Sequence, residues 1–208
     1  MKFGPYFMLC AVLIILIFTN CSKNSDTPAA NYSPTTEGSS WTYVSGTNIF
    51  RLTATNRDTV AAGKTYKVLT NSNGPNNYVA KVGNDYYRFA AVAAIGSNGV
   101  EELYLKDNQD VNATWSTRQN FTAPGFGQLT ADLKYTIKSK GASRVVSGKT
   151  YNNVIQVRSD ISVQTLSVGG GDFYYAEGIG LIESNIAIAV PGLTNISEVQ
   201  SLTAYEIK

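Results

Sequence analysis

With 208 residues, of which 43% are apolar and only 15% are charged, the chain is long enough for one well-filled domain after a leader is removed. Its net charge of +2 gives no reason to expect a nucleic-acid partner. There is no histidine, and the two cysteines, Cys10 and Cys21, both lie near the N-terminus. We therefore expect no Ser-His-Asp site, no metal site, no cofactor and no disulfide in the folded domain.

The N-terminus has the pattern of an export signal. An uncharged apolar run, residues 6–18, follows Lys2. The run has the length of a signal-peptide core and is too short to span a bilayer. It ends in Phe-Thr-Asn-Cys at residues 18–21, which resembles a lipobox, the motif for acylation of a cysteine and cleavage before it. We expect residues 1–20 to be a lipoprotein signal peptide and Cys21 to carry a lipid anchor.

The next segment, residues 21–37, is polar, contains two prolines and has no period. We expect it to consist of the lipidated Cys21 and a flexible tether. The residue after the cysteine is Ser22 and not Asp, which by resemblance to the enteric sorting rule favours the outer membrane of a Gram-negative bacterium. The pattern leaves both the periplasmic leaflet and the cell surface open.

Residues 38–208 alternate between apolar and polar side chains, as strands with one buried face do. In the segment 132–138, for example, Leu133, Tyr135 and Ile137 share one face. Turns rich in glycine and asparagine separate such segments. We predict an all-β fold, a single antiparallel meander of roughly 12 strands curled into an open or closed barrel.

The sequence Gly-Lys-Thr-Tyr occurs twice, at residues 63–66 and 148–151. A nucleotide-binding P-loop needs another glycine five residues before the first one of this motif, and the chain has Asp58 and Ser143 there. We therefore interpret each copy as a turn, with glycine at the bend and tyrosine leading the next strand inward.

Carboxylates are the commonest acid–base groups left in a chain without histidine. A glycosidase needs two of them facing each other across a sugar. Adjacent Glu101 and Glu102 point to opposite faces of a predicted strand, with Leu103 opposite Glu102. Glu177 and Glu183 could meet only at a barrel mouth. We expect no catalytic residue and no enzymatic activity, and a carboxylate-based, glycosidase-like enzyme is the catalytic alternative.

Aromatic residues are the candidate ligand-binding set, and six of them are singled out: Trp41, Tyr86, Tyr87, Trp115, Tyr174 and Tyr175. Packing of a core and of a covering layer is the more common role of such residues. The functional interpretation is a concave apolar face for a lipid or another apolar small molecule, or an aromatic platform for a glycan.

Three motifs carry a resemblance to known proteins. They are an early Gly-x-x-Trp-x-Tyr (residues 38–43), the repeated Gly-Lys-Thr-Tyr turn, and a late Tyr-Tyr-Ala-x-Gly-x-Gly-Leu-Ile (residues 174–182). Together they resemble a family of small uncharacterised outer-membrane lipoproteins of Bacteroidota-type bacteria. The late element is also similar to one in LolA/LolB-like carriers, which are open barrels with a hydrophobic concavity. Lipocalin-like barrels are a second fold resemblance.

The resemblance implies a fold and a cellular location. It implies no catalytic residue. We expect a cell-envelope lipoprotein, held to the membrane through Cys21, that acts as a non-catalytic binding module for an apolar or lipid-like ligand. An envelope interaction protein that contacts another protein or a glycan is the alternative.

Overall fold

A computed structural model describes residues 30–90, 100–123, 127–190 and 194–208. The expected signal peptide and its lipidation site Cys21 lie outside these ranges. Within the ranges the chain forms twelve β-strands and no helix, so none of the described residues belongs to a helix that could cross a membrane. The predicted all-β antiparallel meander is therefore confirmed.

The strands have the following bounds. They are β1 (Ser40–Ser45), β2 (Asn48–Ala61), β3 (Lys64–Asn71), β4 (Asn77–Val82), β5 (Asp85–Ala90), β6 (Val100–Lys106), β7 (Thr114–Ala123), β8 (Gly127–Val146), β9 (Lys149–Val163), β10 (Leu166–Ala176), β11 (Gly180–Val190) and β12 (Thr194–Glu206).

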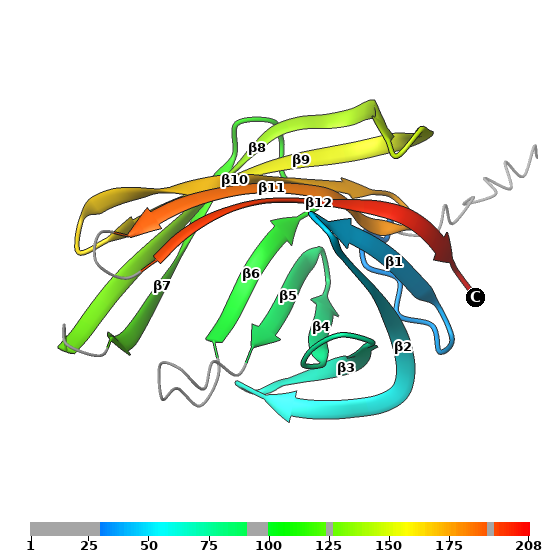
Figure 1. The fold of residues 1–208 in the computed structure, drawn as a ribbon, viewed down its shortest axis with the longest axis horizontal. Coiled ribbons are helices and arrows are strands. Elements are labelled where there is room, and N and C mark those ends of the chain that lie inside the picture. Colours follow the sequence, from blue (N-terminus) through cyan, green and yellow to red (C-terminus); the bar gives the residue numbers. More distant parts are fainter. Residues whose placement is uncertain (1–29, 91–99, 124–126, 191–193) are drawn as a thin grey trace, which may run out of the picture.

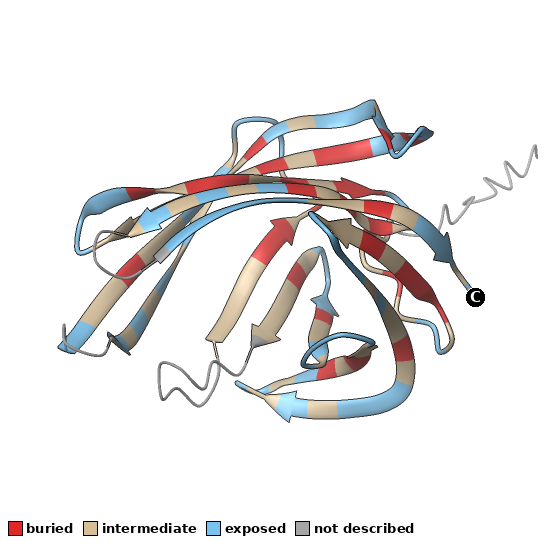
Figure 2. Cartoon of the chain, in the orientation of Figure 1, coloured by how far each residue is buried: buried red, intermediate tan, exposed pale blue. Residues whose placement is uncertain are grey.

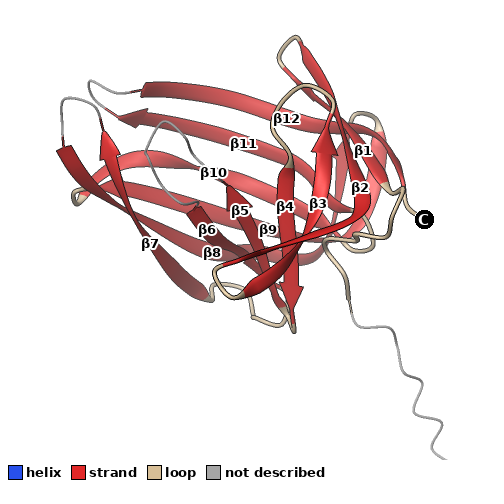
Figure 3. Cartoon of the chain, turned by 90° about the horizontal axis from the view of Figure 1, so that it is seen from below, coloured by secondary structure: helices blue, strands red, loops and turns tan. Residues whose placement is uncertain are grey.

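All twelve strands belong to one sheet in the order β6-β5-β4-β3-β2-β1-β12-β11-β10-β9-β8-β7. Nearly every strand pairs with its neighbours in the chain, and β1 pairs with β12, so the first and last strands lie side by side. Figure 1 shows β8 to β12 arching over β3 to β6, and in the view from below β4 to β6 lie in front of β8 to β10 (Figure 3).

The edge strands β6 and β7 meet through side chains and not through a main-chain ladder. The indole N–H of Trp115 on β7 donates to the carbonyl of Leu103 on β6 at 2.8 Å. The amide nitrogen of Gln119 donates to the carbonyl of Glu101 at 2.7 Å. These bonds bring the two edges together, and the barrel is nearly closed.

The two Gly-Lys-Thr-Tyr segments form equivalent turns, as predicted. Ala62 and Gly63 have φ of 47° and 74°, and Ser147 and Gly148 have φ of 49° and 77°. Two successive residues with positive φ make a type I′ turn, which matches the twist of a hairpin. The tyrosine that follows each turn is buried. The motif is structural at both positions.

Buried residues lie mostly along the middle of the strands, and exposed residues lie mostly toward the strand ends (Figure 2). One core cluster contains Tyr135, Ile137 and Phe173, and a second contains Trp41 and Leu202. Tyr135 and Ile137 are at most 1% exposed, which confirms the predicted buried face of segment 132–138.

A run of three glycines lets β10 lie closely between β9 and β11. A Cβ atom on Gly169 would lie 2.1 Å from the carbonyl oxygen of Ala187 on β11. A Cβ atom on Gly170 would lie 1.9 Å from the carbonyl oxygen of Ser159 on β9. Real Cβ atoms do not approach backbone oxygens so closely, so any side chain at these positions would force the strands apart.

We expect Gly170→Ala to lower the free energy of unfolding by about 1–3 kcal/mol, because the backbone of Ser159 must move. Urea unfolding followed by far-UV circular dichroism measures the change. Gly74→Ala is the matched control, since its nearest neighbour is the flexible end of Asn71 at 3.3 Å and its φ is not positive. Equal losses in the two variants would contradict the close approach at β10.

Candidate ligand-binding cavity

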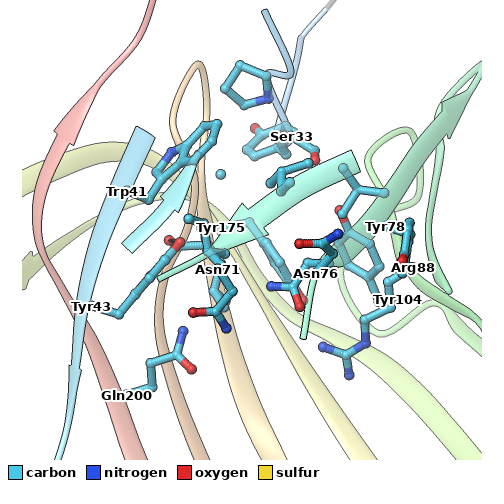
Figure 4. Close-up of a pocket in the computed structure, with 18 of the residues that line it drawn as sticks. Ser33, Trp41, Tyr43, Asn71, Asn76, Tyr78, Arg88, Tyr104, Tyr175 and Gln200 are labelled. Atoms are coloured by element: carbon cyan, nitrogen blue, oxygen red, sulfur yellow. Dashed lines mark hydrogen bonds between the residues drawn. The ribbon is translucent and has the colours of Figure 1, made fainter. Parts of the chain in front are cut away.

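The barrel encloses a cavity of about 480 Å³ (Figure 4). This volume lies in the range of small-molecule sites in proteins. The side chains that line the cavity are mostly aromatic or aliphatic. They include Tyr32, Trp41, Tyr43, Phe50, Leu52, Leu69, Tyr78, Val79, Phe89, Tyr104, Tyr175, Ile179 and Leu181. The cavity can therefore remove a considerable apolar surface from water.

One wall is formed by β1, and its aromatic residues are held by the backbone of the β10–β11 region. The indole N–H of Trp41 donates to the carbonyl of Ile179 at 2.7 Å. The hydroxyl of Tyr43 donates to the carbonyl of Leu181 at 2.8 Å, and its ring stacks on Phe50 with 5.5 Å between centroids. Because the polar atoms are satisfied in the wall, these residues offer the cavity mainly apolar ring surface.

A segment that precedes the first strand closes one end of the barrel. We call it the N-terminal strap, residues 30–39. The Gly178 N–H donates to the carbonyl of Asn31 at 2.7 Å, and the Lys81 ammonium donates to the carbonyl of Ala30 at 2.6 Å. Tyr32 is only 5% exposed and lines the cavity with its two successors. The strap is thus the floor of the cavity.

The hydroxyl of Tyr86 fastens the strap to the barrel. It donates to the buried carboxylate of Asp107 at 2.6 Å and accepts from the backbone N–H of Tyr32 at 3.2 Å. Asp107 is 8% exposed, and the Lys81 ammonium lies 3.9 Å from its carboxylate. Burial and the hydrogen bond to Asp107 raise the pKa of Tyr86 above its usual value, so the hydroxyl stays protonated.

The cavity reaches the surface at the opposite end. Strands of an antiparallel meander alternate in direction, so the β3–β4 turn lies at the end far from the strap. Pro75, Asn76 and Asn77 of this turn line the cavity, and Pro75 and Asn77 are exposed. We call this turn the mouth of the cavity.

The only charged side chain among the cavity-lining residues that the structure describes is Arg88 on β5. Its guanidinium makes two hydrogen bonds to the carboxylate of Glu102 on β6, one of them from Nη2 at 2.8 Å. The Tyr135 hydroxyl donates to the same carboxylate at 2.5 Å. Burial alone would lower the pKa of Arg88, but the Glu102 carboxylate outweighs it and raises that pKa. The guanidinium of Arg88 therefore stays charged.

Two further tyrosine hydroxyls near the cavity remain donors at neutral pH. Burial raises the pKa of Tyr104 to about 12, although Ser33 and Arg88 act in the opposite direction. Burial also raises the pKa of Tyr175 well above its ordinary value. The rings of Tyr104 and Tyr175 lie 5.3 Å apart. They form a wall that combines apolar faces with hydrogen-bond donors.

The structure brings two of the six predicted ligand-binding aromatics, Trp41 and Tyr175, into the cavity lining. The other four lie elsewhere. Tyr86 is fully buried beneath the strap, and Tyr87 packs under the Lys64 ammonium, 4.4 Å from its ring centroid. Trp115 stacks on Tyr135 at the β6–β7 seam, with 5.5 Å between the ring centroids. Tyr174 packs against Arg144, whose guanidinium carbon lies 3.3 Å from the ring centroid.

The last residues of the expected tether are part of the strap. The polar composition of residues 30–37 and Pro34 predict a flexible tether, but in the structure these residues belong to the strap. Buried Tyr32 is the apolar anchor that outweighs the polar composition. The remaining tether residues lie outside the described part of the chain.

Several lining residues are absent from the sequence-based set. Arg88 and Phe89 directly follow the two tyrosines on β5, and Tyr43 follows Trp41 by one alternation of β1. Alternation along β1 would have placed Tyr43 beside Trp41 on one face. Nothing in the local sequence indicates that a charged Arg88 faces the interior, because its partner Glu102 comes from another strand.

The acidic residues weighed as a catalytic pair are engaged outside the cavity. Glu183 is bound by the Arg144 guanidinium at 2.6 Å, and Glu177 accepts from the Asn153 amide at 2.9 Å. Neither lines the cavity. In the described part of the chain no group of three or more acidic, histidine or cysteine residues could hold a metal ion.

Comparison with known proteins gives one structural similarity. No family model matches the chain, and no curated protein matches it. A crystal structure of a "putative lipoprotein" from Parabacteroides distasonis is similar over 85% of this chain and 99% of that one, with a TM-score of 0.52 and 12% identity. At this identity the similarity shows a shared fold. It confirms neither the LolA/LolB-like nor the lipocalin-like resemblance, and lipocalin barrels have eight strands.

We expect Tyr86→Phe to loosen the strap and to lower the free energy of unfolding by about 1–3 kcal/mol, because the buried Asp107 carboxylate loses a donor. Urea unfolding measures the stability, and limited proteolysis within residues 30–39 measures the release of the strap. Tyr87→Phe is the control, since its hydroxyl makes only a 3.4 Å contact with Asp85. The assignment fails if the two variants resist protease equally.

Proposed function

We propose that this protein is a lipid-anchored envelope protein that binds a small, largely apolar ligand in its barrel without transforming it. The observation that carries the proposal is the aromatic cavity of about 480 Å³, closed by the strap and reaching the surface at the mouth. Each Å² of apolar surface that a ligand buries there contributes about 25 cal/mol. Preformed walls reduce the ordering that binding requires.

The state of the barrel interior supports ligand binding over a purely structural or interaction role. A barrel that served only as a scaffold for protein or glycan contacts would gain stability from a filled core. Here large side chains such as Trp41, Tyr43 and Tyr175 surround open space in place of filling it. The partner of such a cavity is a small molecule.

The chemistry of the cavity supports binding without catalysis. None of the described lining residues is an aspartate or glutamate. Glu102 lies next to the cavity, but Arg88 and Tyr135 engage both of its oxygens. A general acid or base must be free to exchange a proton with the substrate, and this carboxylate is not.

The lipid anchor rests on the signal sequence and is supported by the description of the structurally similar Parabacteroides distasonis protein as a "putative lipoprotein". The strap begins at residue 30, so only eight residues separate it from Cys21. Eight residues reach at most about 28 Å. The barrel would therefore stand close to the membrane, most simply the outer membrane, with its strap end nearest the anchor.

Binding of N-phenyl-1-naphthylamine, an uncharged probe whose fluorescence rises in apolar sites, tests the ligand proposal. We expect residues 22–208, which contain every described strand, to bind it at one saturable site. Leu52→Trp places an indole in the cavity and should weaken binding about tenfold or more.

The control for this experiment is Leu166→Trp, because Leu166 lies on β10 with 57% of its surface exposed and does not line the cavity. It adds the same indole outside the barrel and should leave the affinity unchanged. Absence of saturable binding, or equal weakening by the two variants, would refute a ligand site in the cavity.

Membrane association of the full chain tests the anchor. We expect the wild-type protein to fractionate with membranes and to label with radioactive palmitate, and we expect Cys21→Ala to do neither. Cys10→Ala, within the leader, is the control and should behave as wild type. A Cys21→Ala protein that still fractionates with membranes as wild type does would rule out the anchor.

A further inference from the structure

Arg88 presents free hydrogen-bond donors to the cavity. Its side chain keeps 43% of its surface accessible although the residue lies inside the barrel, and it belongs to the cavity lining. Of the five N–H groups of a guanidinium, two bind Glu102. The other three, including both on Nη1, have no acceptor among the described residues. Figure 4 shows the guanidinium at the edge of the group of lining side chains.

We propose that the ligand is a monoanionic amphiphile whose carboxylate binds the free edge of Arg88 while its apolar part occupies the aromatic cavity. This inference rests on the proposed function and adds the chemical class of the ligand to it. A guanidinium edge with two parallel N–H groups matches the two oxygens of a carboxylate, which makes the pair directional as well as strong.

The charge balance of the site favours a single negative charge. The Arg88–Glu102 pair is neutral as a whole, so a carboxylate leaves one net negative charge in the barrel and a phosphate dianion would leave two. The Glu102 carboxylate is covered by the two guanidinium bonds and the Tyr135 hydroxyl. The charge that faces the cavity is therefore positive.

The surroundings of Arg88 provide the other contacts that an amphiphile needs. The rings of Tyr104 and Phe173 lie 5.9 and 5.7 Å from the guanidinium carbon and place aromatic surface beside it. The Tyr175 hydroxyl has no hydrogen-bond partner among the described residues and stays protonated, so it can donate to a ligand oxygen. Phe50 and Leu52 on the β2 wall offer apolar surface to the tail.

Competition against N-phenyl-1-naphthylamine with dodecanoate and with 1-dodecanol tests the inference on residues 22–208. The two amphiphiles share the alkyl chain and differ in the head group. Without a cationic partner the alcohol would bind more tightly, because a carboxylate is costly to desolvate. We expect dodecanoate to bind the wild-type protein about tenfold more tightly than dodecanol.

The two single variants of the ion pair should move the affinity for dodecanoate in opposite directions. Arg88→Gln should weaken dodecanoate about tenfold or more and should change the affinities for the neutral probe and for dodecanol much less. Glu102→Gln removes the negative charge behind the guanidinium and should tighten dodecanoate about threefold or more. If Arg88→Gln does not fold, the double variant Arg88→Gln/Glu102→Gln replaces it in this test. The double variant removes both charges and keeps two amide side chains that can bond to each other. Arg144→Gln, in the outer pair with Glu183, is the matched control.

The outcomes separate this inference from the proposed function. A preference for dodecanoate that disappears in the double variant and survives in Arg144→Gln supports the inference. Equal binding of the two amphiphiles by wild type, or a preference that persists in the double variant, overturns it and leaves the cavity as a site for uncharged ligands. If wild type binds neither the probe nor either amphiphile, the proposed function fails and the inference fails with it.

Discussion

The number of strands is the constraint on which the rest of this structure depends. Eight strands enclose a space that side chains can just fill, and a barrel of more strands encloses more. Twelve strands therefore leave a surplus of interior volume, even with aromatic residues as large as Trp41 and Tyr43 in the walls. The structure deals with this surplus in two ways. A core fills one part of the barrel, and the strap closes the remaining space at one end.

The strap closes one end of the cavity, so the cavity does not run through the barrel as a channel. Its backbone is bonded to β2, β4, β5 and the β10–β11 turn, so several strands hold it at once. Tyr32 contributes a ring to the first core cluster and also lines the cavity. Opening this end would expose that ring and break the hydrogen bond from the Tyr32 N–H to the Tyr86 hydroxyl. A ligand of the proposed kind would then enter and leave at the mouth, near the β3–β4 turn.

The Arg88–Glu102 ion pair has a structural role, and we propose that it also has a binding role. Glu102 and Arg88 come from neighbouring strands, and Tyr135 comes from the far side of the β6–β7 seam. The carboxylate thus links β6 to β8 where the edge strands lack a main-chain ladder. A buried pair of this kind is weak evidence for stability, since a well-packed apolar replacement can be equally stable. Its value lies in the donors that Arg88 keeps for the cavity.

Much of the fold could be predicted from the sequence, and less of the site. Period-two alternation and turn composition report local structure. The meander, the two Gly-Lys-Thr-Tyr turns and the buried face of Tyr135 and Ile137 could therefore be predicted. The same alternation placed Glu102 opposite Leu103 and could not tell which face is interior. Burial of a charge depends on a partner from another strand, and no local pattern contains that information. Trp41 and Tyr175 line the cavity, while Tyr174, one residue away, faces Arg144.

A crystal structure of residues 22–208 soaked with N-phenyl-1-naphthylamine tests whether the barrel interior is a preformed, ligand-sized space. We expect the probe inside the barrel, in contact with Trp41, Phe50 and Tyr175, with the strap in place and the strands unmoved. A structure in which those aromatic side chains have closed over the space, and the probe lies only on the outer surface, would contradict it.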